Sequence, residues 1–348
     1  MSSKELRTGR IFCDDLLLPE GPVVLDDGTL LVTELGLDRG CITLIAADGA
    51  TKRVVAKTGR PNGLAVDHEG TIWVAESLEP SILRLGLERG CITLIAADGA
   101  TRRVVAKTGR PNGLAVDHEG MIWVAESLEP SVLRVSLDGE SVVHATACQG
   151  EPLLWPNDIC VGPDDAIYVT DSGARVTNFL EGATPPRDIR TFPFEGRVCR
   201  FDRSDGTGTV IDRNLRFANG IAFGRDGLLY VNEMLTGNIY RYELTAEKPV
   251  RQLYANVLDP GYSSETLRGP DGMKFDEAGY LYVTVFGQGD VTVIDPTGTV
   301  ADRITLGGNA PTNLAFGLPG SREIFVTEDE HGRAEVHAVP RDGLALHR

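Results

Sequence analysis

Residues 110–127 read RPNGLAVDHEGMIWVAES: a short apolar segment, a polar turn, and a second segment rich in Ile, Trp and Val. Two short runs of this kind around a tight turn predict a β-hairpin. The pattern recurs in six other places along the chain, at residues 18–34, 60–77, 155–172, 217–233, 269–285 and 310–328. Further strand-like runs follow most of these hairpins, and no segment has a convincing helical period.

Four-stranded units repeated at this spacing are typical of a β-propeller, in which blades surround a central channel. We therefore expect an all-β protein in which residues 1–348 form a single propeller domain. The last unit is one strand short. We expect a strand at about residues 8–15 to supply it and close the ring, which would protect the open edges of the sheets.

An internal duplication complicates the number of blades. Residues 35–84 and 85–134 align without gaps and differ at only four positions, Asp38/Glu88, Lys52/Arg102, Thr71/Met121 and Ile82/Val132. The copied block starts and ends inside a blade, so either SILRL (81–85) or CITLI (91–95) is surplus. We expect the copy to add a seventh blade to a six-bladed plan, with an irregular connection near 78–92. The alternative is a six-bladed ring with the surplus extruded.

Composition excludes several classes of function. The formal net charge is −16 and no cluster of Lys and Arg offsets it, which argues against nucleic-acid binding and favours cations as partners. The polar start and the absence of an apolar run of about 18 residues predict a cytoplasmic protein without a membrane partner. We expect a monomer or small homo-oligomer. The six cysteines lack CxxC spacing and are expected to be free thiols.

A position near the start of each inner strand carries a side-chain oxygen in every unit. It follows the Pro or Ala that opens the strand, and its occupants are Glu20, Asn62, Asn112, Asn157, Asn219, Asp271 and Thr312. Equivalent positions of a propeller form a ring at one mouth of the channel. Such a ring suits Ca²⁺, which takes about six to eight oxygen ligands. An Asn-Gly turn preference could explain Asn62 and Asn112, but not the two carboxylates.

Acidic residues also end the second strand in six of the seven units: Glu34, Glu76, Glu126, Asp171, Glu233 and Glu328. Because this feature hardly varies between units, it favours a scaffold hydrogen bond or a solvated strand end over catalysis. These residues are therefore kept apart from the candidate site.

Four motifs, LPEGPVV (18–24), PNDI (156–159), FANGIAF (217–223) and GPDGMKFD (269–276), resemble the gluconolactonase, senescence-marker-protein and luciferin-regenerating-enzyme family and occur in family order. The resemblance covers the chain apart from the extra 50 residues. It implies a propeller with a divalent metal in its channel, held by Glu20, Asn219 and Asp271, with Asn157 beside metal and substrate. We expect Asn157 to be a fourth metal ligand. Ca²⁺ is the expected ion, and Zn²⁺, Mn²⁺ and Mg²⁺ are alternatives.

The resemblance also implies hydrolysis of a lactone or related cyclic ester. A bound cation can polarise the carbonyl and lower the pKa of a coordinated water, and Asp271 is then the candidate general base. Some members that hydrolyse sugar lactones have Arg where this chain has Trp155, so we expect a less hydrophilic substrate. The residues expected to contact the substrate are Asn112, Trp155, Asn157 and Asp158.

Two other functions compete with lactone hydrolysis. A seventh blade would lie between Glu20 and Asn157 and could separate the metal ligands, which would leave a non-catalytic metal-binding propeller or interaction scaffold. Related propellers with such a metal centre also suggest a phosphotriesterase-like hydrolase. A serine hydrolase is disfavoured because the chain contains no GxSxG motif. Segment 173–197 is expected to lie over the channel mouth as a lid.

Overall fold

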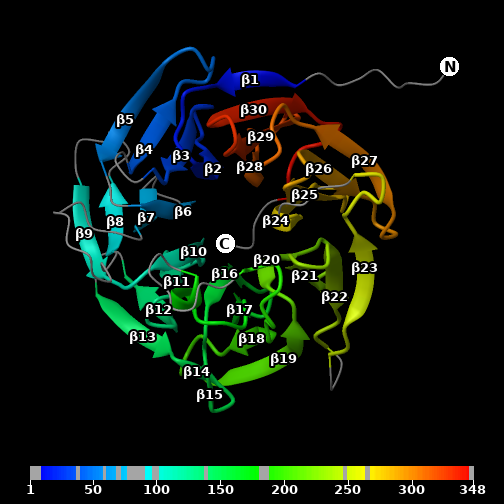
Figure 1. The fold of residues 1–348 in the computed structure, drawn as a ribbon. Helices are drawn as coiled ribbons and strands as arrows, with labels where there is room; N and C mark the ends of the chain where they lie inside the picture. Colours follow the sequence, from blue (N-terminus) through cyan, green and yellow to red (C-terminus); the bar gives the residue numbers. More distant parts are fainter. Residues whose placement is uncertain are drawn as a thin grey trace.

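The computed structural model describes residues 9–36, 40–57, 60–67, 72–76, 91–95, 102–136, 140–179, 188–245, 249–262 and 267–344. Within these residues, seven four-stranded antiparallel sheets stand around a central channel (Figure 1). Each inner strand contacts the inner strand of the next blade, and the last inner strand contacts the first. The predicted β-propeller is therefore confirmed.

The first three blades each use four consecutive strands. Blade 1 contains β2 (Pro19–Val24), β3 (Leu30–Glu34), β4 (Cys41–Ile45) and β5 (Lys52–Lys57). Blade 2 contains β6 (Pro61–Val66), β7 (Ile72–Glu76), β8 (Cys91–Ile95) and β9 (Arg102–Lys107). Blade 3 contains β10 (Pro111–Val116), β11 (Ile122–Glu126), β12 (Ser131–Val135) and β13 (Ser141–Ala145). A two-stranded hairpin of β14 (Ala147–Cys148) and β15 (Glu151–Pro152) follows.

The remaining blades complete the ring. Blade 4 contains β16 (Pro156–Val161), β17 (Ile167–Asp171), β18 (Gly196–Phe201) and β19 (Gly208–Leu215), with the short 3₁₀ helix η1 (Val176–Asn178) between β17 and β18. Blade 5 contains β20 (Ala218–Phe223), β21 (Leu229–Glu233), β22 (Asn238–Tyr242) and β23 (Gln252–Asn256). Blade 6 contains β24 (Gly269–Phe275), β25 (Leu281–Phe286), β26 (Asp290–Ile294) and β27 (Val300–Thr305). Blade 7 contains β28 (Pro311–Phe316), β29 (Glu323–Glu328) and β30 (Arg333–Ala338).

The outer strand of blade 7 comes from the other end of the chain. Strand β1 (Arg10–Cys13) pairs antiparallel with β30, and Arg10 lies opposite Val336. Phe12 packs edge-on against Phe325, with ring centroids 4.9 Å apart. The two ends of the described chain thus share one sheet, which closes the ring by hydrogen bonds rather than by loop contacts alone.

The duplicated block provides the seventh blade. In blade 2, β7 pairs with the CITLI strand β8 along its whole length, from Ile72↔Ile95 to Glu76↔Cys91. The rival arrangement, a six-bladed ring with the surplus strands extruded, is therefore wrong. The SILRL segment and most of the irregular connection expected near 78–92 fall within residues 77–90, which lie outside the described residues.

Close approach of the inner strands explains the Asn-Gly pairs. A Cβ atom on Gly63 would lie 2.3 Å from the carbonyl oxygen of Asn112 in the next blade. A Cβ on Gly220 would similarly lie 2.5 Å from the Asp271 carbonyl oxygen. Any side chain here would clash with the neighbouring backbone, so glycine lets adjacent blades meet at the channel.

A second cross-blade contact distinguishes the copied blades from the others. Thr33 donates to the carbonyl of Asn62 at 2.9 Å, and Thr170 donates to that of Asn219 at 2.6 Å. Blades 2 and 3 have Ala75 and Ala125 at the equivalent position, so their second strands cannot make this bond. Blade 2 must therefore be fixed to blade 3, and blade 3 to blade 4, by other contacts.

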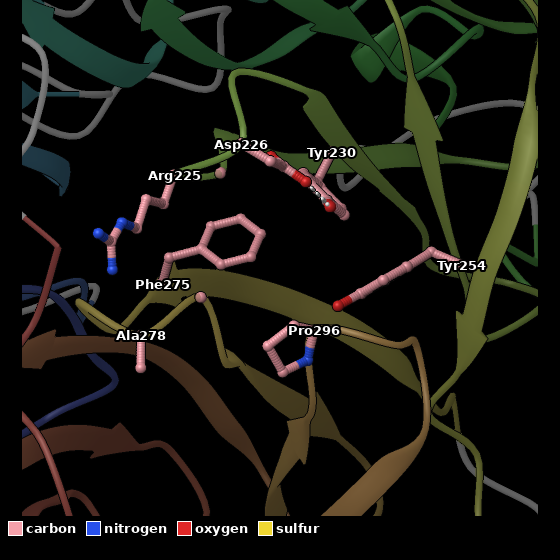
Figure 2. A pocket seen from close by; sticks show the side chains of 9 residues that line it. Arg225, Asp226, Tyr230, Tyr254, Phe275, Ala278 and Pro296 are labelled. Atoms are coloured by element: carbon pink, nitrogen blue, oxygen red, sulfur yellow. Dashed lines mark hydrogen bonds between the residues drawn. The ribbon is translucent and has the colours of Figure 1, made fainter.

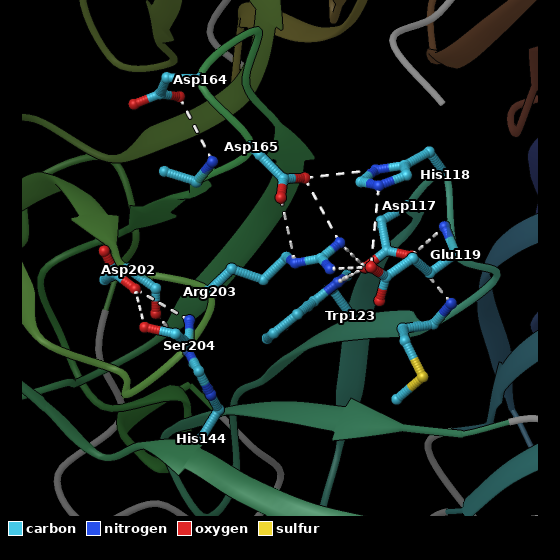
Figure 3. A network of polar contacts seen from close by, with 12 residues as sticks. Asp117, His118, Glu119, Trp123, His144, Asp164, Asp165, Asp202, Arg203 and Ser204 are labelled. Atoms are coloured by element: carbon cyan, nitrogen blue, oxygen red, sulfur yellow. Dashed lines mark hydrogen bonds and ion pairs between the residues drawn. The ribbon is translucent and has the colours of Figure 1, made fainter.

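One such contact is a charged network between blades 3 and 4 (Figure 3). Arg203, in the turn between β18 and β19, pairs with Asp117 at 3.1 Å, Glu119 at 2.7 Å and Asp165 at 3.3 Å. The buried carboxylate of Asp117 also accepts a 2.9 Å hydrogen bond from Nε1 of Trp123. The network joins the second copy to the first blade after the duplication.

Two further expectations concern cysteines and membranes. Five cysteines with described side chains are free thiols: Cys13, Cys41, Cys148, Cys160 and Cys199. A membrane-spanning helix of sufficient length and apolarity does not occur in the described part of the chain.

Candidate active site

The ring of oxygen-bearing residues lies where the inner strands leave regular pairing. The pairing of β20 with β21 shifts register between Ala218 and Ile221, which brackets Asn219, and that of β24 with β25 shifts between Pro270 and Met273, which brackets Asp271. Corresponding shifts occur in the other five blades. Such a bulge re-aims a side chain, so one irregularity repeated seven times places this ring around the channel.

Two of the expected metal ligands are in direct contact. Nδ2 of the buried Asn219 donates a 2.9 Å hydrogen bond to Oδ1 of Asp271 in the next blade. Within the described residues, no hydrogen bond reaches Oδ1 of Asn219 or Oδ2 of Asp271. Burial raises the pKa of Asp271 to about 7, and the nearby carboxylate of Asp158 adds to this shift, whereas the bond from Asn219 opposes it. The pair therefore offers two oxygens for a cation.

Glu20 faces the same electrostatic environment from blade 1. Its Oε2 accepts a 3.2 Å hydrogen bond from the backbone N–H of Gly21. Burial raises its pKa well above the ordinary value, and the carboxylates of Asp271 and Asp329 raise it further. Blades 4 to 7 and blade 1 form one uninterrupted arc of the ring, so the duplicated blades 2 and 3 enlarge the ring on the other side (Figure 1).

The two residues of the Asn-Asp motif in blade 4 are held by the scaffold. Nδ2 of the buried Asn157 donates to the hydroxyl of Ser172 at 3.0 Å. Asp158 accepts backbone N–H bonds from Ile159 at 2.8 Å and from Ile221 of blade 5 at 3.2 Å. Most other units have glycine at the position of Asp158. Here the carboxylate of Asp158 instead connects blades 4 and 5 through its hydrogen bond from Ile221. Burial raises its pKa.

The other ring positions contribute less to this cluster. Asn112 is half-buried on β10, two blades away from Asn219. The hydroxyl of Thr312 donates to the carbonyl of Pro19 at 3.0 Å, so it is used in joining blade 7 to blade 1. The ring therefore has an oxygen-rich side, formed by blades 5, 6 and 1, rather than seven equal donors.

Asp329 is a channel carboxylate that was not identified from the sequence. It directly follows the strand-ending Glu328, a position from which Ser172 and Met234 contact the ring residues Asn157 and Asn219 of their own blades. Its Oδ1 is buried and has no hydrogen-bond partner in the described structure. Burial and the carboxylates of Asp271 and Glu328 raise its pKa to about 7. A comparison of the residue at this position between the seven units would identify Asp329 from the sequence.

The acidic strand ends are scaffold residues, as expected. Glu126 accepts backbone N–H bonds from Gly109 and Leu128, at 3.0 and 2.9 Å. Glu328 likewise accepts N–H bonds from Glu330 and His331, at 2.8 and 3.0 Å. These bonds also explain why Glu328, Glu330 and His331 cluster closely enough to resemble a metal site.

Aromatic side chains pack together at the starts of the inner strands of blades 4 and 5. This group, called the aromatic wall below, consists of Trp155, Phe179, Phe192, Phe194 and Phe217. Trp155 packs against Phe217 and Phe179 with ring centroids 5.3 and 5.7 Å apart. Met234, which touches Asn219 at 3.8 Å, belongs to the same apolar cluster. The described parts of segment 173–197 supply three wall residues; its middle, 180–187, lies outside the described residues.

A cavity of about 290 Å³ lies between blades 5 and 6 (Figure 2). Its lining includes Tyr230, Tyr254 and Phe275. Tyr230 donates to Asp226 at 2.8 Å and Tyr254 to the carbonyl of Asp295 at 2.5 Å, so both hydroxyls have partners. The cavity adjoins the β20–β21 and β24–β25 turns, at the opposite strand ends from Asn219 and Asp271. It is separate from the ring.

The ring residues suit a hard divalent cation. The donors that Asn219, Asp271 and Glu20 offer are all oxygens, as Ca²⁺ and Mg²⁺ prefer. The carboxylates of Asp271 and Asp329 both raise the pKa of Glu20, and that of Asp271 also raises the pKa of Asp329. One buried oxygen of Asp329 lacks a partner in the described structure. Positive charge at this point would relieve both the mutual repulsion and the unmet hydrogen-bonding capacity.

Comparisons with known proteins agree with this architecture. The chain is 32% identical over 167 residues to a pentonolactonase of Haloferax volcanii, covering 47% of this chain and 56% of that protein. It is 30% identical over 148 residues to a diisopropyl-fluorophosphatase of Loligo vulgaris, covering 40% and 45% respectively. The chain thus spans about half the length of the curated relatives it matches.

A solved structure extends the likeness to the whole fold. A gluconolactonase from Xanthomonas campestris superposes with a TM-score of 0.61 at 20% identity, covering 96% of this chain and 91% of that one. At this identity the match concerns the fold alone. The family model described as SMP-30/Gluconolactonase/LRE-like region matches residues 22–148 and 140–329. The chain belongs to the SMP-30/gluconolactonase/LRE-like family.

Proposed function

We propose that this protein is a metal-dependent hydrolase of a lactone or related cyclic ester. The observation that carries the proposal is the contact between Asn219 and Asp271 beside the carboxylate of Glu20. Lactonases among the relatives support the same reaction class. When bound, a divalent cation supplies Lewis acidity that polarises the ester carbonyl and acidifies water.

The ring residues have distinct proposed roles. Asn219, Asp271 and Glu20 would hold the cation, with Asn157 beside it and the substrate. Asp271 is the candidate general base, because its pKa of about 7 lets it exchange a proton near neutral pH. The bond from Asn219 fixes one oxygen of Asp271 and leaves the other to accept a proton. Ca²⁺ is the proposed ion.

The aromatic wall supports a substrate with an apolar portion. Trp155 is half-buried and packs on Phe217, so it can present an indole face to a ligand without moving. Asn112 and Asn157 would supply polar contacts to the substrate. Asp158 is proposed as a substrate contact as well, although both its oxygens accept backbone hydrogen bonds and so fix its position.

A phosphotriesterase-like activity is the second candidate. The observation in its favour is the similarity to the diisopropyl-fluorophosphatase of Loligo vulgaris. The same Lewis acid chemistry suits a phosphoryl oxygen as well as a carbonyl oxygen. A non-catalytic metal-binding propeller is the third. The cytoplasmic location and the monomeric or small oligomeric state stay predictions.

One experiment separates these functions. Purified protein is treated with EDTA, dialysed, and assayed with added Ca²⁺, Mg²⁺, Mn²⁺ or Zn²⁺ against a panel of five- and six-membered lactones and diisopropyl fluorophosphate. Hydrolysis of lactones that EDTA abolishes and one cation restores is the expected result. Metal binding without turnover of any substrate would replace the lactonase with the non-catalytic alternative.

A further inference from the structure

The duplication places the same arginine in two neighbouring blades. Arg60 and Arg110 are equivalent residues of the two copies, and each directly precedes an inner strand, β6 or β10. These strands meet closely, because the Cβ position of Gly63 lies 2.3 Å from the Asn112 carbonyl oxygen. Both arginines are half-buried. They therefore lie near one another at the ring end of the inner strands.

The two guanidinium groups have few partners. Nε of Arg60 donates to the carbonyl of Leu35 at 3.1 Å. In the part of the chain that the structure describes, neither arginine forms an ion pair and the guanidinium of Arg110 donates no hydrogen bond. Burial lowers the pKa of Arg110, and the proximity of Arg60 lowers it further.

The nearby carboxylate of Glu126 offsets part of the charge of Arg110 but forms no ion pair with it in the described structure. Glu126 is close enough to affect Arg110, but its carboxylate accepts the backbone N–H groups of Gly109, Arg110 and Leu128. Two adjacent cations without a bridging anion repel each other and retain unused N–H donors. Because the formal net charge of the chain is −16, a general excess of positive charge does not account for this pair of arginines.

Other blades place different residues at the same position. Trp155 of blade 4 and Phe217 of blade 5 also directly precede inner strands, and both belong to the aromatic wall. The entrance to the ring therefore changes from cationic on blades 2 and 3 to aromatic on blades 4 and 5. A ligand lying across it would meet charge and apolar surface on different sides.

We infer that Arg60 and Arg110 form a binding subsite for an oxyanion, and that the substrate carries a carboxylate, sulfate or phosphate substituent there. Guanidinium groups bind such oxyanions through charge-assisted hydrogen bonds, often with two N–H groups each. Only the assignment of the oxyanion to the substrate rests on the proposed hydrolase function. The binding of an anion does not.

Equilibrium binding of inorganic sulfate tests the subsite without any turnover. Titration calorimetry is done on the Ca²⁺-loaded protein and after EDTA treatment, with Arg60→Gln, Arg110→Gln and the double variant. Arg53→Gln is the matched control, because Arg53 is an exposed residue of β5 and its loss changes the net charge equally. Saturable binding that weakens about tenfold in each single variant and disappears in the double variant is expected.

Several outcomes would overturn the inference. Unsaturable binding, binding that survives in the double variant, or an equal loss in Arg53→Gln would mean that sulfate only screens surface charge. A kinetic arm compares a lactone bearing a carboxylate with its neutral methyl ester, and Arg110→Gln should raise KM for the charged lactone alone. If no lactone is hydrolysed, the proposed function fails while the sulfate titration still decides the subsite.

Discussion

Nδ2 of Asn219 donates a 2.9 Å hydrogen bond to Oδ1 of Asp271 across the boundary between blades 5 and 6. The two residues are 52 positions apart, yet each lies near the start of an inner strand, at a register shift of the same kind. The bond orients both side chains, leaving an amide oxygen and a carboxylate oxygen for a cation. The geometry of the candidate site thus depends on the repeat itself.

Asp271→Asn preserves the shape of this pair but removes its negative charge. We expect kcat/KM for metal-dependent lactone hydrolysis to fall at least about 100-fold, because both the general base and a charged ligand are lost. Calcium affinity, measured by titration calorimetry, should fall as well. Asp302→Asn, at an exposed position of β27, is the control and should leave both quantities unchanged. Undiminished turnover in Asp271→Asn would reject this assignment.

Metal-free protein should lose stability as the pH rises through neutrality. Burial raises the pKa values of Asp271 and Asp329 to about 7, so the folded state binds more protons than the unfolded chain above the ordinary carboxylate range of about 4. The contribution of these two groups to the free energy of unfolding is complete below about pH 4. It is lost as the pH rises from about 4 to about 7. Thermal unfolding of EDTA-treated protein between pH 5 and 8 measures this trend.

Calcium should reverse the trend, because it competes with protons for the same carboxylates. The increase in Tm on adding Ca²⁺ is therefore expected to be larger at pH 8 than at pH 5. An equal increase at both values would show that Asp271 and Asp329 do not contribute to the binding site.

Asp329→Ser tests the carboxylate that lies beside the ring. Blades 3 and 4 carry Ser127 and Ser172 at the equivalent position, so the fold accommodates serine there. Loss of one negative charge near the cation should weaken calcium binding about tenfold. Glu330→Gln is the control, since Glu330 is exposed and also carries one charge nearby. Equal calcium affinities for wild type and Asp329→Ser would remove Asp329 from the site.

The sequence was sufficient to predict the propeller and the ring because both depend on a pattern repeated in every unit. The same comparison between units identifies Asn219 and Asp271, which the structure brings into contact. Asp329 was missed because only the acidic residue before it was compared, and that residue proved to be a scaffold group. Its relation to Glu20 and Asp271 depends on how blade 7 joins blade 1.

Other features of the site have no local sequence signal. Phe179, Phe192 and Phe194 lie in a segment without periodicity. The packing of Phe179 against Trp155 and of Phe194 against Phe217 is a tertiary contact. The sequence shows that Arg60 and Arg110 are equivalent residues of the two copies, but their proximity depends on blades 2 and 3 being neighbours. That adjacency required the duplicated block to form its own blade.

Trp155→Ala tests the apolar side of the substrate site. Removing the indole should raise KM for lactones with an alkyl substituent about tenfold while changing KM for the unsubstituted lactone little, because burial of a few methylene groups contributes about 1 to 2 kcal/mol. The comparison is made with γ-butyrolactone and γ-nonalactone. A matched increase for both substrates would instead indicate a general disturbance of the channel mouth.

Arg203→Gln tests how the duplicated blades are anchored. Its guanidinium is the positive partner of Asp117, Glu119 and Asp165, and Asp117 has a fully buried side chain. Loss of the charge should lower the free energy of unfolding by about 1 to 3 kcal/mol, because Asp117 keeps its bond from Trp123 but loses its counter-ion. Arg200→Gln is the control, because its pair with Asp164 is more exposed and should contribute about 0.5 kcal/mol. Chemical denaturation of both variants measures the difference, and equal losses would show that the network does not specifically support the junction between blades 3 and 4.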